Sequence, residues 1–156
     1  MKKFSLFLIV AISILVANCA GSNSFKKVST TAENIAIKGY DTVAYFADNG
    51  AVKGNPQYEF VWNGAKWLFS NKENLEKFQK NPEIYAPQFG GYCSYSMSHG
   101  KLADGDPNEW KVVDGKLYLI NNPEAKKKWE AGQQKLIEDG KKNWEDVQTK
   151  KPENKG

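Results

Sequence analysis

Two β-hairpin signals, each followed by a helix signal, constrain the fold of this chain more than any other feature. Asn63-Gly64 and Asp114-Gly115 each separate two runs rich in aromatic and β-branched residues. Both dipeptides tolerate the positive φ angles of a type I′ turn, whose twist matches that of paired strands. The turns begin at positions 63 and 114, 51 residues apart, which predicts an internal repeat. At this offset Trp67 aligns with Tyr118, Leu68 with Leu119, Phe69 with Ile120 and Phe78 with Trp129.

Each hairpin is followed by residues that begin a helix. Ser70 and Glu73 have the spacing of a capping box, and Asn81-Pro82 ends that first helix and starts a short turn. Asn122-Pro123 predicts the second helix, because Asn caps well and Pro suits the first helical position. Its apolar stripe consists of Trp129, Leu136, Ile137, Trp144 and Val147. Gly132 and Gly140 lie on or near this apolar stripe and indicate either close packing or a break near Gly140.

These elements predict an α+β fold with a small antiparallel sheet and a C-terminal amphipathic helix. A further strand is expected near residues 42–46. We expect one domain over residues 37–147 and a disordered tail over 148–156. Cys93 is the only cysteine of that domain, so it has no internal disulfide and must rely on its core. Five Trp, seven Tyr and eight Phe can supply that core.

The N-terminus has the pattern of a secretory signal. Lys2 and Lys3 precede residues 4–17, which are uncharged and mostly apolar. This run is shorter than the ~20 apolar residues that cross a bilayer. Residues 15–19 resemble a bacterial lipobox, with departures at Val16 and Asn18. We expect a signal peptide over 1–18, a lipidated Cys19 and a flexible tether over 19–36. An uncleaved anchor and a secreted protein with a chance cysteine are the alternatives.

Lipidation at Cys19 would attach the chain to a membrane. Lipoproteins carry two or three acyl chains such as palmitate at this position, and two chains hold stably, since each buried CH₂ contributes ~0.8 kcal/mol. Inner-membrane retention usually involves Asp after the lipidated cysteine, whereas Ala20 stands here. The expected location is therefore the bacterial cell envelope, with the outer membrane favoured over the inner.

The charge balance does not point to nucleic acid. The full chain has a formal net charge of +4, and loss of Lys2 and Lys3 with the signal would leave +2. The lysines at 126–128 and 150–151 are best interpreted as solvated surfaces. We expect no nucleic-acid partner, and a membrane contact through the lipid anchor.

One segment could carry chemistry. It holds Cys93, Met97 and His99, a thiol, a thioether and the only imidazole, after a Gly90-Gly91 pair that permits irregular backbone. In a helix, Cys93 and Met97 share one face, and soft donors of this kind suit Cu(I), while imidazole suits copper or zinc. Two alternatives stay open: a buried thiol that packs as a small hydrophobe, and a Cys–His nucleophile pair.

Several runs in the chain resemble the YHS domain family. They are residues 38–46, 67–70 and 81–88 and the motif Gly90-Gly91-Tyr92-Cys93. The resemblance extends from about Ile37 to Trp129. It implies a small metal-handling module of the kind that accompanies heavy-metal transporters, with no enzymatic activity. Members associated with metals often carry two cysteines, whereas this domain has only Cys93.

The sequence therefore predicts a membrane-anchored lipoprotein with a YHS-like binding domain and no catalytic turnover. Its candidate ligand is a soft metal ion, copper or zinc, held by Cys93, Met97 and His99. The alternative is an interaction lipoprotein that binds a protein or a small apolar ligand through an aromatic surface. Exposure of Cys93 beside Met97 and His99 would favour the metal, and a buried Cys93 would favour the alternative.

Overall fold

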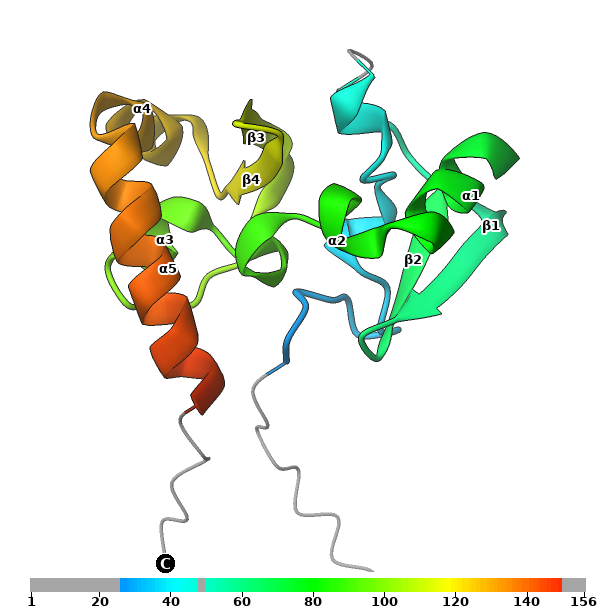
Figure 1. The fold of residues 1–156 in the computed structure, drawn as a ribbon, viewed down its shortest axis with the longest axis horizontal. Coiled ribbons are helices and arrows are strands. Elements are labelled where there is room, and N and C mark those ends of the chain that lie inside the picture. Colours follow the sequence, from blue (N-terminus) through cyan, green and yellow to red (C-terminus); the bar gives the residue numbers. More distant parts are fainter. Residues whose placement is uncertain (1–25, 48–49, 150–156) are drawn as a thin grey trace, which may run out of the picture.

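Two β-hairpins, each followed by a helix, organise the computed structural model, which describes residues 26–47 and 50–149 (Figure 1). The α+β class and the C-terminal helix are confirmed. In chain order the elements are the 3₁₀ helices η1 (Ile37–Gly39) and η2 (Ala44–Phe46), strands β1 (Asn55–Trp62) and β2 (Ala65–Phe69), helices α1 (Lys72–Lys80) and α2 (Pro82–Tyr85), η3 (Gln88–Gly91), α3 (Ser94–Ser98), strands β3 (Asp106–Val113) and β4 (Lys116–Ile120), and helices α4 (Pro123–Ala131) and α5 (Gln133–Thr149).

The internal repeat extends to details of the backbone. Asn63 and Gly64 have φ angles of 49° and 72°, and Asp114 and Gly115 have 49° and 70°, as a type I′ turn requires. The pairing of β1 with β2 is irregular between residues 55 and 59, and that of β3 with β4 between 106 and 110. These irregular segments are also 51 residues apart, so the two hairpins share one register.

The strands do not form a single sheet. In the described part of the chain, β1 and β2 make one two-stranded antiparallel sheet, and β3 and β4 make another. The prediction of a strand near residues 42–46 is wrong, because residues 44–46 form the 3₁₀ helix η2. The Asp41 carboxylate causes this: its Oδ1 accepts hydrogen bonds from the backbone N–H groups of Val43 (2.9 Å) and Ala44 (3.3 Å) and turns the chain.

The first helix begins one residue later than the capping box predicts. Asn71 is the N-cap of α1, and its Oδ1 accepts a hydrogen bond from the backbone N–H of Asn74 at 2.9 Å. Ser70 does not cap the helix, since its hydroxyl donates to Oδ2 of Asp41 at 2.6 Å instead. A partner distant in sequence therefore overrides the local capping signal.

The C-terminal helical region divides into α4 and α5. Asn122 caps α4 as expected, accepting a hydrogen bond from the N–H of Ala125 at 2.8 Å. The break lies at Gly132, the C-cap of α4, and Gly140 lies inside α5. A Cβ at Gly140 would be 2.8 Å from Cζ of Phe89. This glycine therefore permits close packing of α5 against Phe89, which is one of the two interpretations that the sequence allows.

The core consists of two clusters. One lies around β2 and α1 and includes Val28, Ala36 and Ile37; the other lies around α3, β4, α4 and α5. Val28 is only 4% exposed, so the folded part extends N-terminal of the expected domain start at Ile37. Within residues 26–47 and 50–149, no helix has the length and hydrophobicity needed to cross a membrane.

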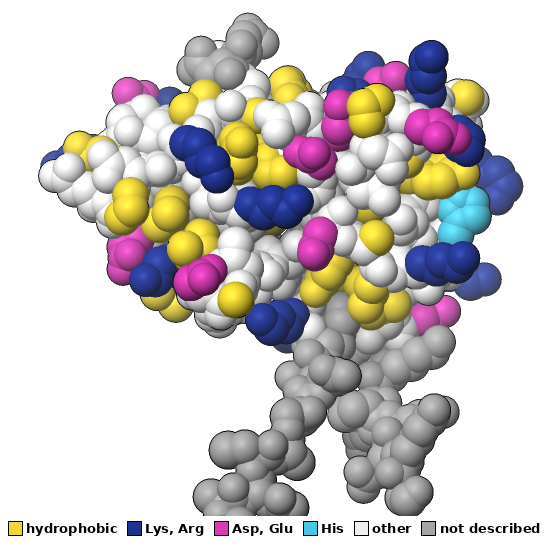
Figure 2. Space-filling model, turned by 180° about the vertical axis from the view of Figure 1, so that it is seen from behind, with side chains coloured by type: hydrophobic (Ala, Val, Ile, Leu, Met, Phe, Trp, Pro, Cys, Tyr) yellow, Lys and Arg dark blue, Asp and Glu magenta, His cyan; other side chains and the backbone are white. Residues whose placement is uncertain are grey.

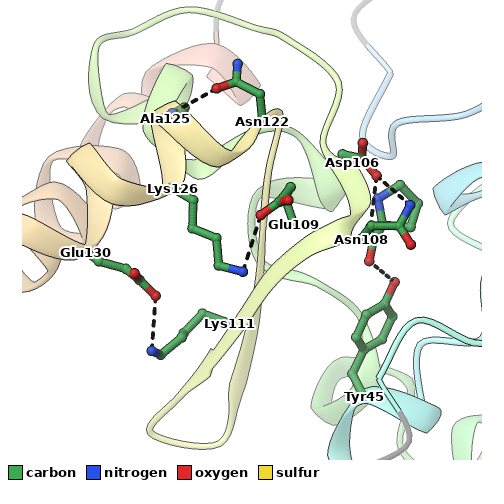
Figure 3. Close-up of polar contacts among 10 residues, drawn as sticks. Tyr45, Asp106, Asn108, Glu109, Lys111, Asn122, Ala125, Lys126 and Glu130 are labelled. Carbon is green, nitrogen blue, oxygen red and sulfur yellow. Dashed lines mark hydrogen bonds and ion pairs between the residues drawn. The ribbon is translucent and has the colours of Figure 1, made fainter.

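Strand β3 is tied to elements on both sides (Figure 3). The buried Tyr45 of η2 donates its hydroxyl to the carbonyl of Pro107 at 2.8 Å. Burial raises the pKa of Tyr45 above its ordinary value, which strengthens the preference for the protonated hydroxyl that donates this hydrogen bond. Two ion pairs then join β3 to α4: Lys126 with Glu109 at 3.3 Å, and Lys111 with Glu130 at 3.1 Å.

The backbone of the N-terminal segment at Lys27 passes very close to Gly90, which has no side chain to obstruct it. An alanine substitution at Gly90 tests this packing directly. A Cβ at Gly90 would clash with the carbonyl oxygen of Lys27, whereas a Cβ at Gly64 would meet nothing within 4 Å. Both glycines have positive φ, so both alanine variants carry similar backbone strain of ~1 kcal/mol. We expect Gly90→Ala to destabilise the protein by ~2 kcal/mol more than Gly64→Ala in urea unfolding. Equal losses would contradict this packing.

Candidate functional site

Cys93 and Met97 share one face of α3, as the sequence predicts. Cys93 is the N-cap residue: its Sγ accepts a hydrogen bond from the N–H of Ser96 at 3.4 Å. The N–H of Met97 donates to the carbonyl of Cys93 at 2.9 Å. Both side chains are 0% exposed. They pack in the second core cluster with Phe89, Tyr118, Ile120, Ala125, Trp129 and Ile137.

His99 lies in a different environment from the two sulfur atoms. It is the C-cap residue of α3 and its side chain is exposed, visible as the histidine in Figure 2. Its Nδ1 is 2.8 Å from the carbonyl oxygen of Tyr95 and 3.0 Å from Oγ of Ser98. Nδ1 is thus occupied by local contacts on α3 itself.

The arrangement bears on metal binding, which stays a prediction for these residues. Two of the three candidate ligands, Cys93 and Met97, are in the core and the third is at the surface. Among the described residues, no group of three or more His, Cys, Asp or Glu side chains could hold a metal ion. A copper or zinc ion at Cys93 would therefore require the second core cluster to open.

The accessibility of the Cys93 thiol can be measured directly. In a Cys19→Ser mature chain, Cys93 is the only thiol. We expect its reaction with DTNB to be at least ~100-fold slower in buffer than in urea, because a fully buried thiol reacts only after an opening that costs ~3 kcal/mol. An anaerobic Cu(I) competition titration of this chain, beside Cys93→Ala and Met97→Leu, should show equal binding by all three. Fast labelling, or Cu(I) binding lost in both variants, would contradict the buried-core interpretation.

A larger candidate site lies elsewhere, in a pocket of about 510 Å³. It is lined by parts of the first hairpin, the segment from α2 to η3, the C-terminal half of α5, and Lys27 and Val28. Figure 1 shows α5 on one side of α2 and the β1–β2 hairpin on the other. The pocket therefore joins the two halves of the repeat, close to the N-terminal segment.

Four aromatic side chains line this pocket. Trp62 ends β1 just before the type I′ turn, and Trp67 on β2 donates its indole N–H to the carbonyl of Trp62 at 3.0 Å. The rings of these two residues are 5.6 Å apart at 61°. Across the pocket, the Trp144 ring on α5 is 6.2 Å from that of Phe89. Trp62 and Trp144 are half-buried, so part of each ring is accessible to a ligand.

The same pocket carries charges of both signs. Lys27 and Lys141 line it together with Glu83 and Glu145, and all four side chains are exposed. The ion pairs found within residues 26–47 and 50–149 involve none of these four. Such a site can stack an apolar or aromatic group on indole rings while pairing charged groups at its rim.

Sequence reasoning did not identify this pocket. The sequence pattern places Trp144 on the apolar stripe of a helix and Trp62 on a hairpin strand. Nothing in the local pattern around Trp62, Glu83 or Trp144 shows that tertiary structure brings them together. One sequence signal does point to an accessible aromatic site: tryptophan stands next to charged or turn residues, as in Trp62-Asn63 and Trp144-Glu145.

Comparison with known families supports the resemblance seen in the sequence. The YHS domain model matches residues 43–89, which confirms the YHS domain. This span is shorter than the expected one, and it ends before Gly90, so Cys93, Met97 and His99 lie outside it. It does contain Trp62, Trp67, Glu83 and Phe89 of the pocket. Comparisons with curated proteins and with solved structures gave no match.

Proposed function

We propose that this chain, which carries a YHS domain at residues 43–89, is an envelope lipoprotein that binds a small organic ligand in the aromatic pocket. The observation that carries the proposal is the combination of pocket volume and lining. A volume of about 510 Å³ falls within the ~300–1,000 Å³ typical of small-molecule sites. Half-buried indole rings beside charged side chains that form no ion pair within residues 26–47 and 50–149 provide both contact area and orientation for such a ligand.

This proposal takes the non-metal alternative from the sequence. The burial of Cys93 and Met97 supports that choice, because an ion would have to displace core packing to reach them. We propose binding without catalytic turnover. Lysines and acidic side chains are interspersed on the face shown in Figure 2, which is consistent with the expected absence of a nucleic-acid partner.

The membrane anchor belongs to the same proposal. The signal peptide and Cys19 lie outside the described residues, so the sequence alone supports lipidation. The charged start, the short apolar run and the lipobox-like segment favour it. With Ala20 after the cysteine, we propose the outer membrane of the bacterial envelope as the location.

Native mass spectrometry tests the binding role. A Cys19→Ser chain, exported in its own host behind a signal peptide whose cleavage does not depend on Cys19, can be purified without detergent. We expect a bound organic molecule in this chain, and at least a tenfold lower occupancy in the Trp62→Leu and Trp144→Leu variants. Trp110→Leu is the matched control, since Trp110 does not line the pocket. A stoichiometric metal ion, or an empty protein at all concentrations, would overturn the proposal.

A further inference from the structure

We infer that the aromatic pocket faces the membrane and takes a single-chain zwitterionic amphiphile from its surface. This inference rests on the proposed function, since it names the ligand class of the same pocket and depends on the anchor at Cys19. Three observations lead to it: the short distance along the chain from Cys19 to the pocket, the way the N-terminal segment is held, and the charges that line the pocket.

The N-terminal segment is part of the fold from its first described residues. The N–H of Ser29 donates to the carbonyl of Gly90 at 2.8 Å, and its hydroxyl donates to Asp104 at 2.6 Å. Tyr92 donates its hydroxyl to the carbonyl of Lys26 at 3.1 Å. Val28, between them, is buried. The chain that can act as a tether therefore ends near Lys26, ten residues before the expected end of the tether at residue 36.

This anchoring limits how far the pocket can lie from the bilayer. Lys27, a lining residue, is eight positions from Cys19. Eight residues span at most ~29 Å when fully extended. The C-terminal end of α5, which contributes Glu145 and Gln148 to the pocket, lies at the same end of the molecule as the N-terminal segment (Figure 1). With Cys19 in the membrane, this end of the domain is the end nearest to it.

The lining of the pocket has the chemistry of an amphiphile binding site. Indole rings and lysines suit the interface between headgroups and water, because each combines an apolar body with a polar end. An acyl chain would pack against the accessible parts of the Trp62 and Trp144 rings. Two cationic and two anionic side chains, none of them in an ion pair within the described structure, complement a headgroup that has both signs of charge, such as phosphoethanolamine.

The headgroup preference can be tested in solution with the Cys19→Ser mature chain. The probes are myristoyl lysophosphatidylethanolamine, myristate and myristyl trimethylammonium, which share one chain length and differ in charge. Tryptophan fluorescence reports binding below the micelle concentration. We expect the zwitterionic probe to bind at least tenfold more tightly than the other two. The double variant Lys141→Ala, Glu145→Ala should lose this preference. Lys142→Ala should keep it, since Lys142 is exposed beside the pocket without lining it.

The membrane-facing position of the pocket is tested with the lipidated chain in phosphatidylcholine vesicles. These vesicles also contain lysophosphatidylethanolamine whose acyl chain is brominated, because bromine quenches the fluorescence of a tryptophan that it contacts. We expect strong quenching in the wild type, and severalfold less after insertion of a long Gly/Ser segment behind Ser22. Equal quenching in both would overturn the orientation, and no headgroup preference would overturn the ligand class. If no amphiphile binds while another organic molecule copurifies, only this inference fails. If nothing binds at all, the proposed function fails with it.

Discussion

Asp41→Ala is expected to destabilise the domain by about 4 kcal/mol, the largest effect of any single substitution proposed for its fold. Asp41 is 0% exposed, and its carboxylate connects two segments far apart in the sequence. Oδ1 accepts from the backbone of η2, as described above. Oδ2 accepts from the N–H of Ser70 at 2.8 Å, from its hydroxyl at 2.6 Å, and from the side-chain amide of Asn74 at 2.7 Å.

The size of this loss of stability follows from the hydrogen-bond donors around Asp41 that would lose their acceptor. Alanine would leave several buried N–H and O–H groups without an acceptor, and each such group costs roughly 1–3 kcal/mol. Asp41→Asn keeps the shape but places an amide nitrogen or a weaker oxygen opposite these donors, so we expect an intermediate loss. Ser70→Ala removes one donor together with its hydrogen bond and should cost only ~1 kcal/mol.

Urea unfolding followed by circular dichroism measures these differences. Asp104→Ala is the control, since Asp104 is an exposed carboxylate that accepts one side-chain hydrogen bond, from Ser29. We expect a loss of no more than ~1 kcal/mol for this variant. If Asp41→Ala were no more destabilising than Asp104→Ala, the buried carboxylate would not hold η2 to α1.

Cys19→Ser is expected to abolish lipidation and release the protein from the membrane. The acyl chains of a lipoprotein are attached at this cysteine, so the serine variant has no site for them. Metabolic labelling with an alkyne analogue of palmitate should mark the wild type and leave Cys19→Ser unmarked. If residues 1–18 are replaced by a signal peptide whose cleavage does not depend on Cys19, fractionation should find the serine variant in the soluble fraction.

The chain contains its own matched control for this experiment. Cys93→Ser removes the other cysteine, which is buried in the core. This variant should take up as much label as the wild type and stay in the membrane fraction. Equal labelling of wild type and Cys19→Ser, or loss of label in Cys93→Ser alone, would show that Cys19 is not the lipidated residue.

Local chemistry made the two repeat units predictable. The positive φ of Asn63 and Asp114, the helix start at Asn122 and the shared face of Cys93 and Met97 all depend on neighbours within a few residues. Turn geometry and capping are short-range interactions, so their signals are present in a short stretch of sequence. The YHS resemblance was likewise visible as short runs around these elements.

Predictions from local sequence patterns are wrong where a residue distant in the sequence binds the group on which the pattern depends. Ser70 has the spacing of a helix cap, yet Asp41, 29 residues earlier, takes its hydroxyl. The same carboxylate bends residues 44–46 into η2, although their composition suits a strand. In both cases a buried charge gains more from several hydrogen bonds than the segment gains from its local preference.

The sequence by itself determined the hairpin–helix repeat, the α+β class and the chemistry available at Cys19 and Cys93. Only the tertiary structure decided that Cys93 and Met97 lie in the core while His99 lies at the surface. It also decided that Trp62, Glu83 and Trp144 line one pocket. Burial and pocket formation depend on which elements pack together, and that packing joins residues as far apart as Lys27 and Gln148, beyond the range of any local pattern.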